Sequence, residues 1–281
     1  MPDPTRLLTT LRQAARHWQN TPGRVGRIVS LHDAREVIVC GDLHGNVENF
    51  RLMLKRAGLA AHPQRHLVIQ EVVHGPFRYP SGGDKSHQLL DLTAALTCQF
   101  PGRVHFLLGN HELAQWQAQR IGKGDEDYNE MFHKGVEAAY GERAGEVYEA
   151  YLELFAAAPL IVRTPNCVCL SHSLPAARHL DTFTRADWER PDLRPEDTRL
   201  GGCVHALVWG RDNSLPTVRA FLAKLDADLL ITGHIPCDTG YGVPNERQLI
   251  LDAVNTPACV CLFATDRPLT QQDLLAGVGT L

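Results

Sequence analysis

Short apolar runs alternate with longer amphipathic stretches through the first 110 residues of the chain. The apolar runs have the length of buried strands and lie at residues 36–42, 66–71 and 104–110. Between and before them, hydrophobic positions recur at helical spacing, in residues 6–18, 46–58 and 86–100. This alternation of strand and helix predicts an α/β fold in which helices cover a sheet.

The rest of the chain keeps the same character and shows no linker or internal repeat. Residues 112–158 predict helices broken near Gly122–Gly124 and at Gly141. Residues 181–200 are polar, contain two prolines and predict a long surface loop. Further strand-like runs lie at residues 160–173, 228–234, 247–254 and 258–264. We therefore expect a single domain over residues 1–281, with an N-terminal helical extension (1–35) and a helical insertion (112–158).

Composition narrows the class of protein. Hydrophobic residues make up 44% of the chain and charged residues 21%, as in soluble globular proteins. The net charge is −4 and no Lys/Arg block stands out, which weighs against partners such as nucleic acid or an anionic membrane. The first residues carry frequent charges, so no secretory leader is expected, and eight cysteines fit reduced thiols. We expect a cytoplasmic protein.

The most informative pattern is the kind of residue that ends each apolar run. In an α/β sheet the carboxyl ends of the strands form the rim where ligands bind. Ligand-type side chains reach this rim from five runs, and they are Asp42, His44, Glu71, Asn110, His111, His172 and His234. Any one of these residues alone is weak evidence for a functional site, because a lone histidine is usually structural and Asp42 could simply cap the next helix. Together they predict a convergent polar cluster.

The mixture of ligand types predicts a pair of metal ions. Carboxylate, imidazole and amide oxygen suit Mn²⁺, Fe or Zn²⁺ better than Cu(I) or Ca²⁺. Asp42 and His44 lie two residues apart and could face one ion, and Glu71 would lie between that ion and a second one. Two divalent ions carry four positive charges, and the two carboxylates Asp42 and Glu71 neutralise two of them. The remaining positive charge suits a phosphate dianion.

At this point the motifs resemble a known family. "GDLHGN", "LLGNHE", "CLSHSLP" and "ITGHIP", in this order, are similar to the calcineurin-like metallophosphoesterases, and most similar to their Ser/Thr protein phosphatase branch. "LVWGRDN" at 207–213 resembles that branch's W-x-R segment. The resemblance covers roughly residues 36–240 and implies a four-layer αββα sandwich with a dinuclear metal site at the strand ends.

The resemblance also implies roles for individual residues. Asp42 and His44 would bind the first metal, and Asn110, His172 and His234 the second. His111 would be the general acid and Arg211 a clamp on phosphoryl oxygens. A hydroxide between two ions, Mn most readily and Fe or Zn as alternatives, would attack phosphorus in line.

The second motif departs from the family. Where the family has G-D-x-x-D-R-G, with its first Asp bridging the metals, this chain has "QEVVHGP". Glu71 follows Asp42 by 29 residues, close to the family's interval, so we align Glu71 with the bridging Asp. Asp84 is the rival for that position, but it lies in a Gly-rich loop rather than at a strand end.

"GGDKSHQLLDL" at 82–92 resembles the family's continuation into its next helix, which makes residues 72–83 an insertion beside the site. His74, Arg78 and Lys85 are then candidate substrate contacts. The alternative is that Asp84 caps the following helix and Lys85 is solvated.

Three functions remain open on the sequence. The leading one is a metal-dependent phosphomonoester hydrolase, with phosphoserine or phosphothreonine in proteins as candidate substrates. A nucleotide or dinucleoside polyphosphate hydrolase would use the same metal centre. A binding or regulatory protein with a degenerate site is favoured by the altered second motif, but every other ligand position carries a ligating residue.

Overall fold

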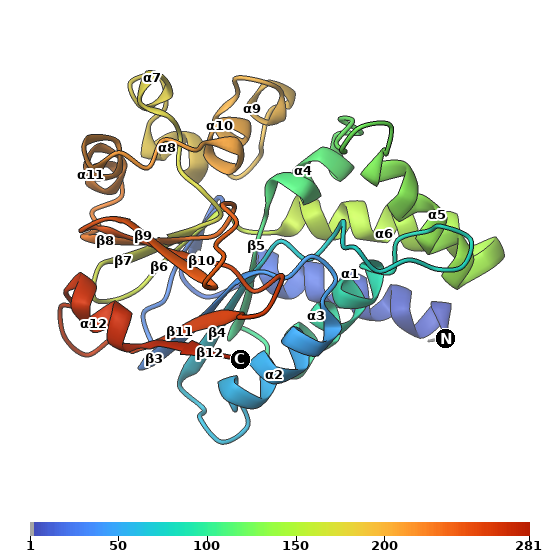
Figure 1. The fold of residues 1–281 in the computed structure, drawn as a ribbon, viewed down its shortest axis with the longest axis horizontal. Helices are drawn as coiled ribbons and strands as arrows, with labels where there is room; N and C mark the ends of the chain where they lie inside the picture. The colour runs from blue at the N-terminus through green and yellow to red at the C-terminus, as the bar shows by residue number, and fades with distance from the viewer. Residues whose placement is uncertain (1–2) are drawn as a thin grey trace.

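The computed structural model describes residues 3–281 and consists of two β-sheets packed face to face between layers of helices (Figure 1). One sheet has the order β1-β2-β6-β7-β8-β10-β9. Its strands, in that order, are Arg24–Val25, Ile28–Ser30, Ile161–Arg163, Val168–Ser171, Leu229–Thr232, Gln248–Leu251 and Tyr241–Asn245. The other sheet has the order β12-β11-β3-β4-β5. Its strands are Val278–Thr280, Cys259–Ala264, Glu36–Asp42, Arg65–Gln70 and Val104–Leu107.

The central strands are apolar on both faces because both faces are covered. In β3, Val37 and Val39 belong to the core between the sheets, whereas Ile38 belongs to the core beneath the helices. β3, β4 and β5 run parallel, so their carboxyl ends lie at one edge. β7, β8 and β10 are likewise parallel to one another. The nearly continuous hydrophobic runs in the sequence follow from this burial on two sides.

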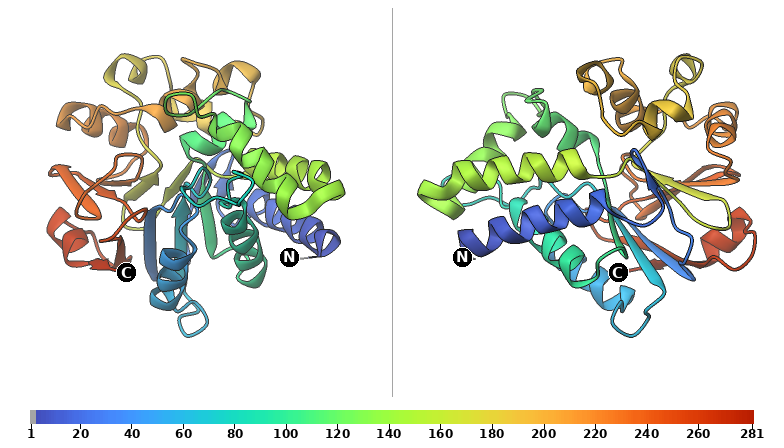
Figure 2. Two further views of the ribbon diagram at one scale, coloured as in Figure 1. Left: turned by 45° about the vertical axis from the view of Figure 1, so that its right-hand side comes forward. Right: turned by 180° about the vertical axis from the view of Figure 1, so that it is seen from behind.

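Helices form the outer layers. Those beside the five-stranded sheet are α1 (Pro4–Gln19), α2 (Val47–Ala57), α3 (His87–Gln99), α4 (Asn110–Trp116), α5 (Tyr128–Tyr140) and α6 (Ala144–Ala157), with a short 3₁₀ turn at Gly141–Arg143. Those on the outer side of the seven-stranded sheet are α7 (Ala177–Leu180), α8 (Arg185–Glu189), α9 (Pro195–Thr198), α10 (Cys203–Trp209) and α11 (Leu215–Lys224). A last helix, α12 (Gln271–Ala276), packs against β10 and β11. Figure 2 shows α1 lying along α6 and α3.

Two predicted segments have more structure than expected. Residues 181–200, predicted as a surface loop, contain α8 and α9. Thr184 and Asp187 cap each other at the start of α8, and Pro195 occupies the first turn of α9. Such local capping needs no amphipathic period, so short helices escape a search for hydrophobic spacing.

The predicted N-terminal helical extension, residues 1–35, consists of α1 followed by the β1–β2 hairpin, and β2 joins the larger sheet through β6. Met1 and Pro2 lie outside the described residues. Among residues 3–281, no helix combines the length and the apolar character that crossing a bilayer requires. The predicted α/β sandwich with two sheets is confirmed.

The two sheets meet where the functional residues are expected. Asp42 ends β3, and a single parallel bridge pairs it with Asp252, which directly follows β10. The backbone N–H of Ala253 donates to the carbonyl oxygen of Asp42 at 3.0 Å. The carboxyl ends of strands from both sheets are thereby held together around one point.

Candidate metal centre

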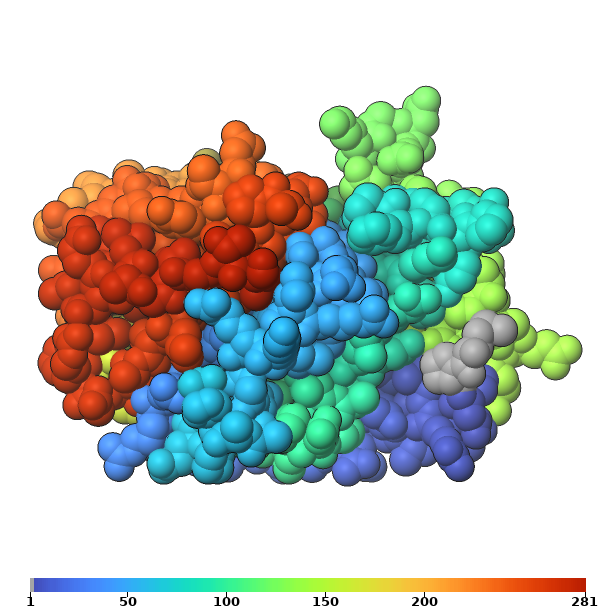
Figure 3. Space-filling view, turned by 60° about the horizontal axis from the view of Figure 1, so that its bottom comes forward, coloured from blue at the N-terminus to red at the C-terminus, as the bar shows by residue number. Residues whose placement is uncertain are grey.

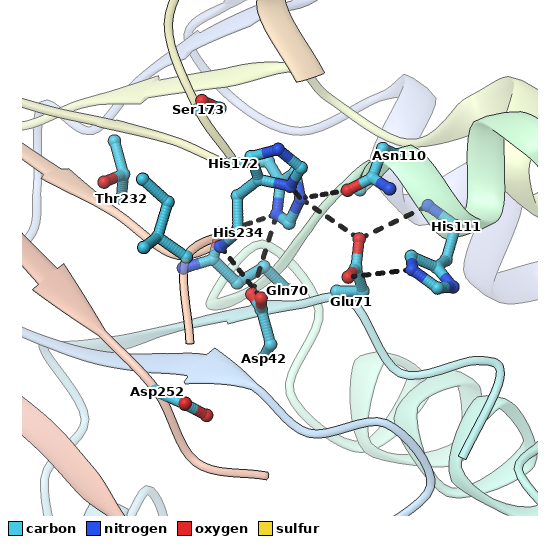
Figure 4. Close-up of polar contacts among 12 residues, drawn as sticks. Asp42, Gln70, Glu71, Asn110, His111, His172, Ser173, Thr232, His234 and Asp252 are labelled. Carbon is cyan, nitrogen blue, oxygen red and sulfur yellow. Dashed lines mark hydrogen bonds and ion pairs between the residues drawn. The ribbon is translucent and has the colours of Figure 1, made fainter. Parts of the chain in front are cut away.

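The strand-end residues predicted from the sequence converge at this junction of the two sheets. They come from the ends of β3, β4, β7 and β8 and from the start of α4 (Figure 4). Most of them line a cavity of about 200 Å³. The lining includes Asp42, His44, Glu71, Asn110, His111, Arg211, His234 and Asp252.

Glu71 lies at the centre of the cluster and is only 1% exposed. Its Oε1 is 3.0 Å from Nε2 of His44, and its Oε2 is 3.0 Å from Nε2 of His172. Figure 4 shows the carboxylate between His172 and Asn110 on one side and His111 on the other. Each oxygen of Glu71 therefore faces a different group of ligand-type side chains.

Nε2 of His172 has too many polar neighbours for an imidazole nitrogen. It is 2.9 Å from Oδ1 of Asn110, 3.0 Å from Oε2 of Glu71 and 3.2 Å from Nδ1 of His234. A ring nitrogen carries at most one hydrogen and cannot satisfy three such atoms. Adjacent ligands of an octahedral ion bound at about 2.1 Å lie about 3 Å apart, so these separations fit a shared cation.

The buried carboxylates also need nearby positive charge if they are to be ionised together. Oδ1 of Asp42 is buried with no hydrogen-bond partner among the described residues, while its Oδ2 accepts from the His234 N–H at 2.8 Å. Burial and the nearby charge of Glu71 raise the pKa of Asp42 to about 7. The same two causes raise the pKa of Glu112 to about 7. Carboxylates packed this closely ionise together only when positive charge lies among them.

His44 responds to the same field in the opposite sense. Burial opposes its protonation, but the hydrogen bond and charge of Glu71, with the charge of Asp42, raise its pKa to about 10. Its Nδ1 donates to the carbonyl oxygen of Val73 at 2.8 Å, which turns Nε2 toward the centre. A metal ion would take the place of the proton that these carboxylates otherwise attract.

The backbone at the cluster adopts conformations that side chains other than glycine rarely tolerate. The φ angles of His44, Glu71, His74 and His234 are 40°, 39°, 60° and 68°. Such strain concentrates at functional sites, where surrounding structure enforces it. Gly109 makes room for the bridge: a Cβ there would lie 2.3 Å from Oε2 of Glu71.

Comparison with known proteins agrees with this geometry. The sequence pattern of the calcineurin-like phosphoesterase family matches residues 36–238, more than half of the chain. The chain belongs to the calcineurin-like phosphoesterases. This is a family of phosphoric ester hydrolases, and the resemblance seen in the motifs is confirmed.

The chain is similar to curated serine/threonine-protein phosphatases at low identity. A probable one from Encephalitozoon cuniculi is 25% identical over 79% of this chain and 47% of the relative. The catalytic subunit of serine/threonine-protein phosphatase 6 from Caenorhabditis elegans is 23% identical over 73% of this chain and 60% of the relative. The chain thus spans roughly half of the length of these relatives.

Solved structures share the fold. A protein serine/threonine phosphatase from Saccharomyces cerevisiae superposes with a TM-score of 0.69 at 16% identity, covering 94% of this chain and 83% of that one. A cold-active protein-tyrosine phosphatase from a psychrophilic Shewanella gives 0.63 at 14% identity, covering 89% and 80%. At such identities the likeness concerns the fold alone.

The candidate substrate contacts differ in whether they line the cavity. Arg211 lines the cavity and is exposed. Arg78 donates to the carbonyl oxygen of Gly75 and pairs with Asp84 at 3.5 Å, and Lys85 lies 5.2 Å from the centre of the Tyr79 ring. Neither Arg78 nor Lys85 lines the cavity. Figure 3 shows the segment that carries them at the surface beside α2.

Asp84 and His74 have defined structural contacts. Asp84 is 1% exposed and accepts from both the N–H and the hydroxyl of Ser86, directly before α3. Glu71, and not Asp84, is among the residues whose ligand atoms converge. His74 contacts His111 rather than the open cavity, with 2.9 Å between their Nδ1 atoms.

Three further side chains belong to the centre and are not among the residues predicted from the sequence. Asp252 follows the apolar run Leu249–Leu251, so the strand-end signal that predicts Asp42 applies to it as well. Gln70 is buried, and its Oε1 is 3.3 Å from Nδ1 of His172. Glu112 is fully buried and accepts from the backbone behind Glu71. Gln70 and Glu112 lie inside the quoted motifs "QEVVHGP" and "LLGNHE", but the motifs alone did not indicate the contacts that the two residues make.

Proposed function

We propose that this phosphoesterase is a dinuclear metal-dependent phosphomonoester hydrolase whose substrates are proteins phosphorylated on serine or threonine. The observation that carries the proposal is the position of Glu71, which directs one oxygen to His44 and the other to His172, each at 3.0 Å. A carboxylate so placed can offer one oxygen to each of two cations. The serine/threonine-protein phosphatases among its relatives support the substrate class.

The donor set divides into two overlapping groups. Asp42, His44 and Glu71 would hold one ion, and Glu71, Asn110, His172 and His234 the other. Oxygen and imidazole donors of this kind suit Mn²⁺ first, with Fe or Zn²⁺ as alternatives. When bound, the ions would supply water activation and neutralisation of phosphoryl charge.

The remaining side chains act on the substrate directly. Arg211 lines the cavity and makes no ion pair within residues 3–281, so its guanidinium is available to two phosphoryl oxygens. His111 lines the same cavity, with Nε2 3.9 Å from Oε1 of Glu71. From there His111 can protonate the leaving oxygen. Both carboxylate oxygens of Asp252 accept backbone N–H groups, from Cys237 and Val254, so Asp252 holds in place the two segments that contribute Pro236 and Val254 to the cavity lining.

The test combines metal content with hydrolysis. Metal-stripped protein is refilled with Mn²⁺, and its bound metal and turnover of phenyl phosphate, a phosphoserine peptide and ATP are measured. We expect two ions per chain and hydrolysis of the two monoesters. Glu71→Gln should bind less metal, and its activity should fall more than about 100-fold. Mutation of residues that only support a metal ligand already lowers metal affinity or activity by about 10–100-fold.

Asp84→Asn is the matched control, since Asp84 is buried and, within residues 3–281, its carboxylate makes polar contacts with Ser86 and Arg78 alone. It should keep both ions. Loss of metal in Asp84→Asn but not in Glu71→Gln would reject the assignment of the bridge. ATP turnover exceeding that of the monoesters would reject the substrate class, and failure to bind any divalent ion would reject the hydrolase.

A further inference from the structure

Two arginines of the β1–β2 hairpin, Arg24 and Arg27, line a separate cavity on the side of the molecule where α1 and α6 end. This arginine cavity has a volume of about 360 Å³, and its lining also includes Gln19, Ala156 and Asp192. α1 and α6 lie along each other, so carbonyl groups of their last turns come together beside the hairpin (Figure 2). None of the residues that line the arginine cavity lines the cavity of the candidate metal centre.

The turn of the hairpin is fixed against the segment that forms the other wall of the arginine cavity. The backbone N–H of Arg27 donates to the carbonyl oxygen of Trp188 at 2.7 Å. Gly26 has a φ of 57°, and a Cβ there would lie 2.3 Å from the carbonyl carbon of Glu189. Since the backbones are in contact at this point, the two arginines extend from a closely packed frame into the cavity.

One nitrogen of each guanidinium group binds carbonyl groups at a helix end. Nη1 of Arg24 donates to the carbonyl oxygens of Trp18 and Ala157, at 2.9 and 2.7 Å. Nη1 of Arg27 donates to the carbonyl oxygen of Ala156. These carbonyls belong to the last turns of α1 and α6, where positive charge is favourable. Helix capping therefore explains part of each arginine's contacts.

The other donors of the two guanidinium groups have no partner in the protein. Within residues 3–281, neither Arg24 nor Arg27 forms an ion pair, and Nη2 of each has no hydrogen-bond acceptor. Nε of Arg27 is buried and also lacks an acceptor in this part of the chain. Nε and Nη2 form the edge of a guanidinium that binds a carboxylate or a phosphate through two parallel hydrogen bonds. Arg27 thus has its anion-binding edge unused.

The charges around the arginine cavity favour an anion as well. Burial, followed by the charge of Arg27, lowers the pKa of Arg24 to about 10, so both charges persist at neutral pH. Burial also lowers the pKa of Arg27, and the charge of Asp192 opposes that shift. One carboxylate beside two guanidinium groups leaves one positive charge, which a bound anion would neutralise.

We propose that the arginine cavity binds a small organic anion, whose phosphate or carboxylate group is held by Arg24 and Arg27. A volume of about 360 Å³ lies in the range of small-molecule sites and exceeds what a lone oxyanion fills, so the ligand has an organic part besides its charged group. The inference goes beyond the proposed hydrolase function and does not depend on it, because no residue of the candidate metal centre takes part.

The first experiment titrates the purified full chain with sodium sulfate at constant ionic strength. Sulfate represents the phosphate group and is not hydrolysed by a phosphatase. NMR of the arginine Nε–H groups reports each guanidinium separately. We expect the signal of Arg27 to shift along a saturating curve, with one anion per chain, whether or not Zn²⁺ has been added. A shift that grows linearly with sulfate would overturn the proposal.

Arg163 is the internal control for this titration. Its Nε is also buried without a partner within residues 3–281, and its Nη2 donates to the carbonyl oxygen of Asp226 at 3.0 Å. Arg163 does not line the arginine cavity, so its signal should stay in place. If Arg163 shifts as much as Arg27, sulfate acts on arginines in general and the site is rejected.

Two variants should change the affinity for sulfate in opposite directions, which isothermal titration calorimetry measures. Arg27→Gln should weaken binding at least about 10-fold, because it removes hydrogen bonds from a charged donor. Asp192→Asn should strengthen binding about 2–5-fold, because it removes the one acidic residue in the described lining of this cavity. Asp192 is exposed, so this variant tests the site even if Arg27→Gln does not fold. Unchanged affinity in Asp192→Asn would contradict the proposal.

A parallel titration with acetate identifies the charged group that the arginine cavity prefers. Tighter binding of sulfate assigns a phosphate, and tighter binding of acetate assigns a carboxylate. No saturable binding of either ion would overturn the inference. Sulfate binding by a protein that takes up no divalent metal would reject the proposed hydrolase and leave this inference standing. Metal uptake and hydrolysis without anion binding here would do the reverse.

Discussion

At the scale of single residues, Glu112 shows how one buried carboxylate holds the backbone around the centre. Its Oε1 accepts from the N–H groups of Val72 and Val73 at 2.8 and 3.1 Å, and its Oε2 accepts from that of Gly109 at 3.1 Å. These donors flank Glu71 on the two chain segments that meet there. Only an acceptor at both oxygens satisfies all three.

Glu112→Gln should therefore destabilise the protein. The amide keeps one acceptor oxygen and turns an N–H toward a backbone N–H, which leaves a buried donor unpaired. We expect the free energy of unfolding in urea to fall by about 2–3 kcal/mol. The exposed change Glu142→Gln should leave it unaltered, and a similar stability of Glu112→Gln and the wild type would contradict this account of the contacts.

Residue roles differ in how far the sequence foretells them. Asp42, Glu71 and His172 are predictable because each ends an apolar run, and a parallel sheet gathers such ends at one edge. The contact of His74 with His111 is not, since it joins residues 37 apart and depends on a φ of 60° at His74. A left-handed backbone enforced on a histidine has no signature in the order of hydrophobic and polar residues.

At the scale of elements, β4 and β5 carry a buried pair of histidines, His66 and His105, away from the strand ends that form the candidate metal centre. Nδ1 of His66 is 3.0 Å from Nε2 of His105, and both side chains share the inner face with Val68 and Leu107. Burial, followed by the neighbouring His66, lowers the pKa of His105 to about 3. Burial also lowers the pKa of His66.

This pair predicts a loss of stability in mild acid. Folded His105 stays neutral, whereas the unfolded chain takes up a proton near its ordinary pKa of 6.5, so the unfolded state binds more protons. The contribution is complete above that pKa and is lost as the pH falls toward 3. At about pH 5 the stability lost because folded His105 stays neutral is about 2 kcal/mol.

Urea unfolding at about pH 7.5 and about pH 5 measures the effect. His105→Leu should lose about 2 kcal/mol less stability between the two than the wild type. The exposed change His133→Asn should lose as much as the wild type. An unchanged pH dependence in His105→Leu would mean that the pair is not kept neutral.

The sequence predicts strands that are buried, because burial imposes a run of apolar residues. It does not predict exposed edge strands, whose residues follow no such pattern. β3 is predicted over the residues that it occupies, because both of its faces are covered. β9 is an edge strand with three of its five residues exposed and a proline at position 244, and it shows no alternation. β12 is three residues long and partly exposed, and its pairing with β11 alone defines it.

At the scale of the whole molecule, the family pattern and the folding unit have different limits. The pattern ends at residue 238, but β9, β10, β11 and β12 all follow it. β11 pairs with β3 along five residue pairs, and Asp252 bridges to Asp42. The match thus omits the strands that complete both sheets beside the candidate metal centre.

A fragment of residues 36–238 should fail to fold. Without β11, β3 becomes an edge strand whose inner residues lose their cover. We expect no cooperative thermal transition by circular dichroism and no Mn²⁺ binding, whereas residues 3–281 should show both. A cooperative transition in the fragment would show that the last four strands, β9 to β12, are dispensable.

The position of β11 between β12 and β3 also sets the order in which the molecule can be completed as it is synthesised. The neighbour of β3 leaves the ribosome about 220 residues after β3 itself, a delay of roughly 10–40 s at roughly 5–20 residues per second. Throughout that interval one hydrogen-bonding edge of β3 has no strand beside it. Asp42, at the end of β3, cannot form its bridge with Asp252 until the later segment has been synthesised. We therefore expect the proposed centre to bind metal tightly only after β11 has paired with β3, at the end of synthesis.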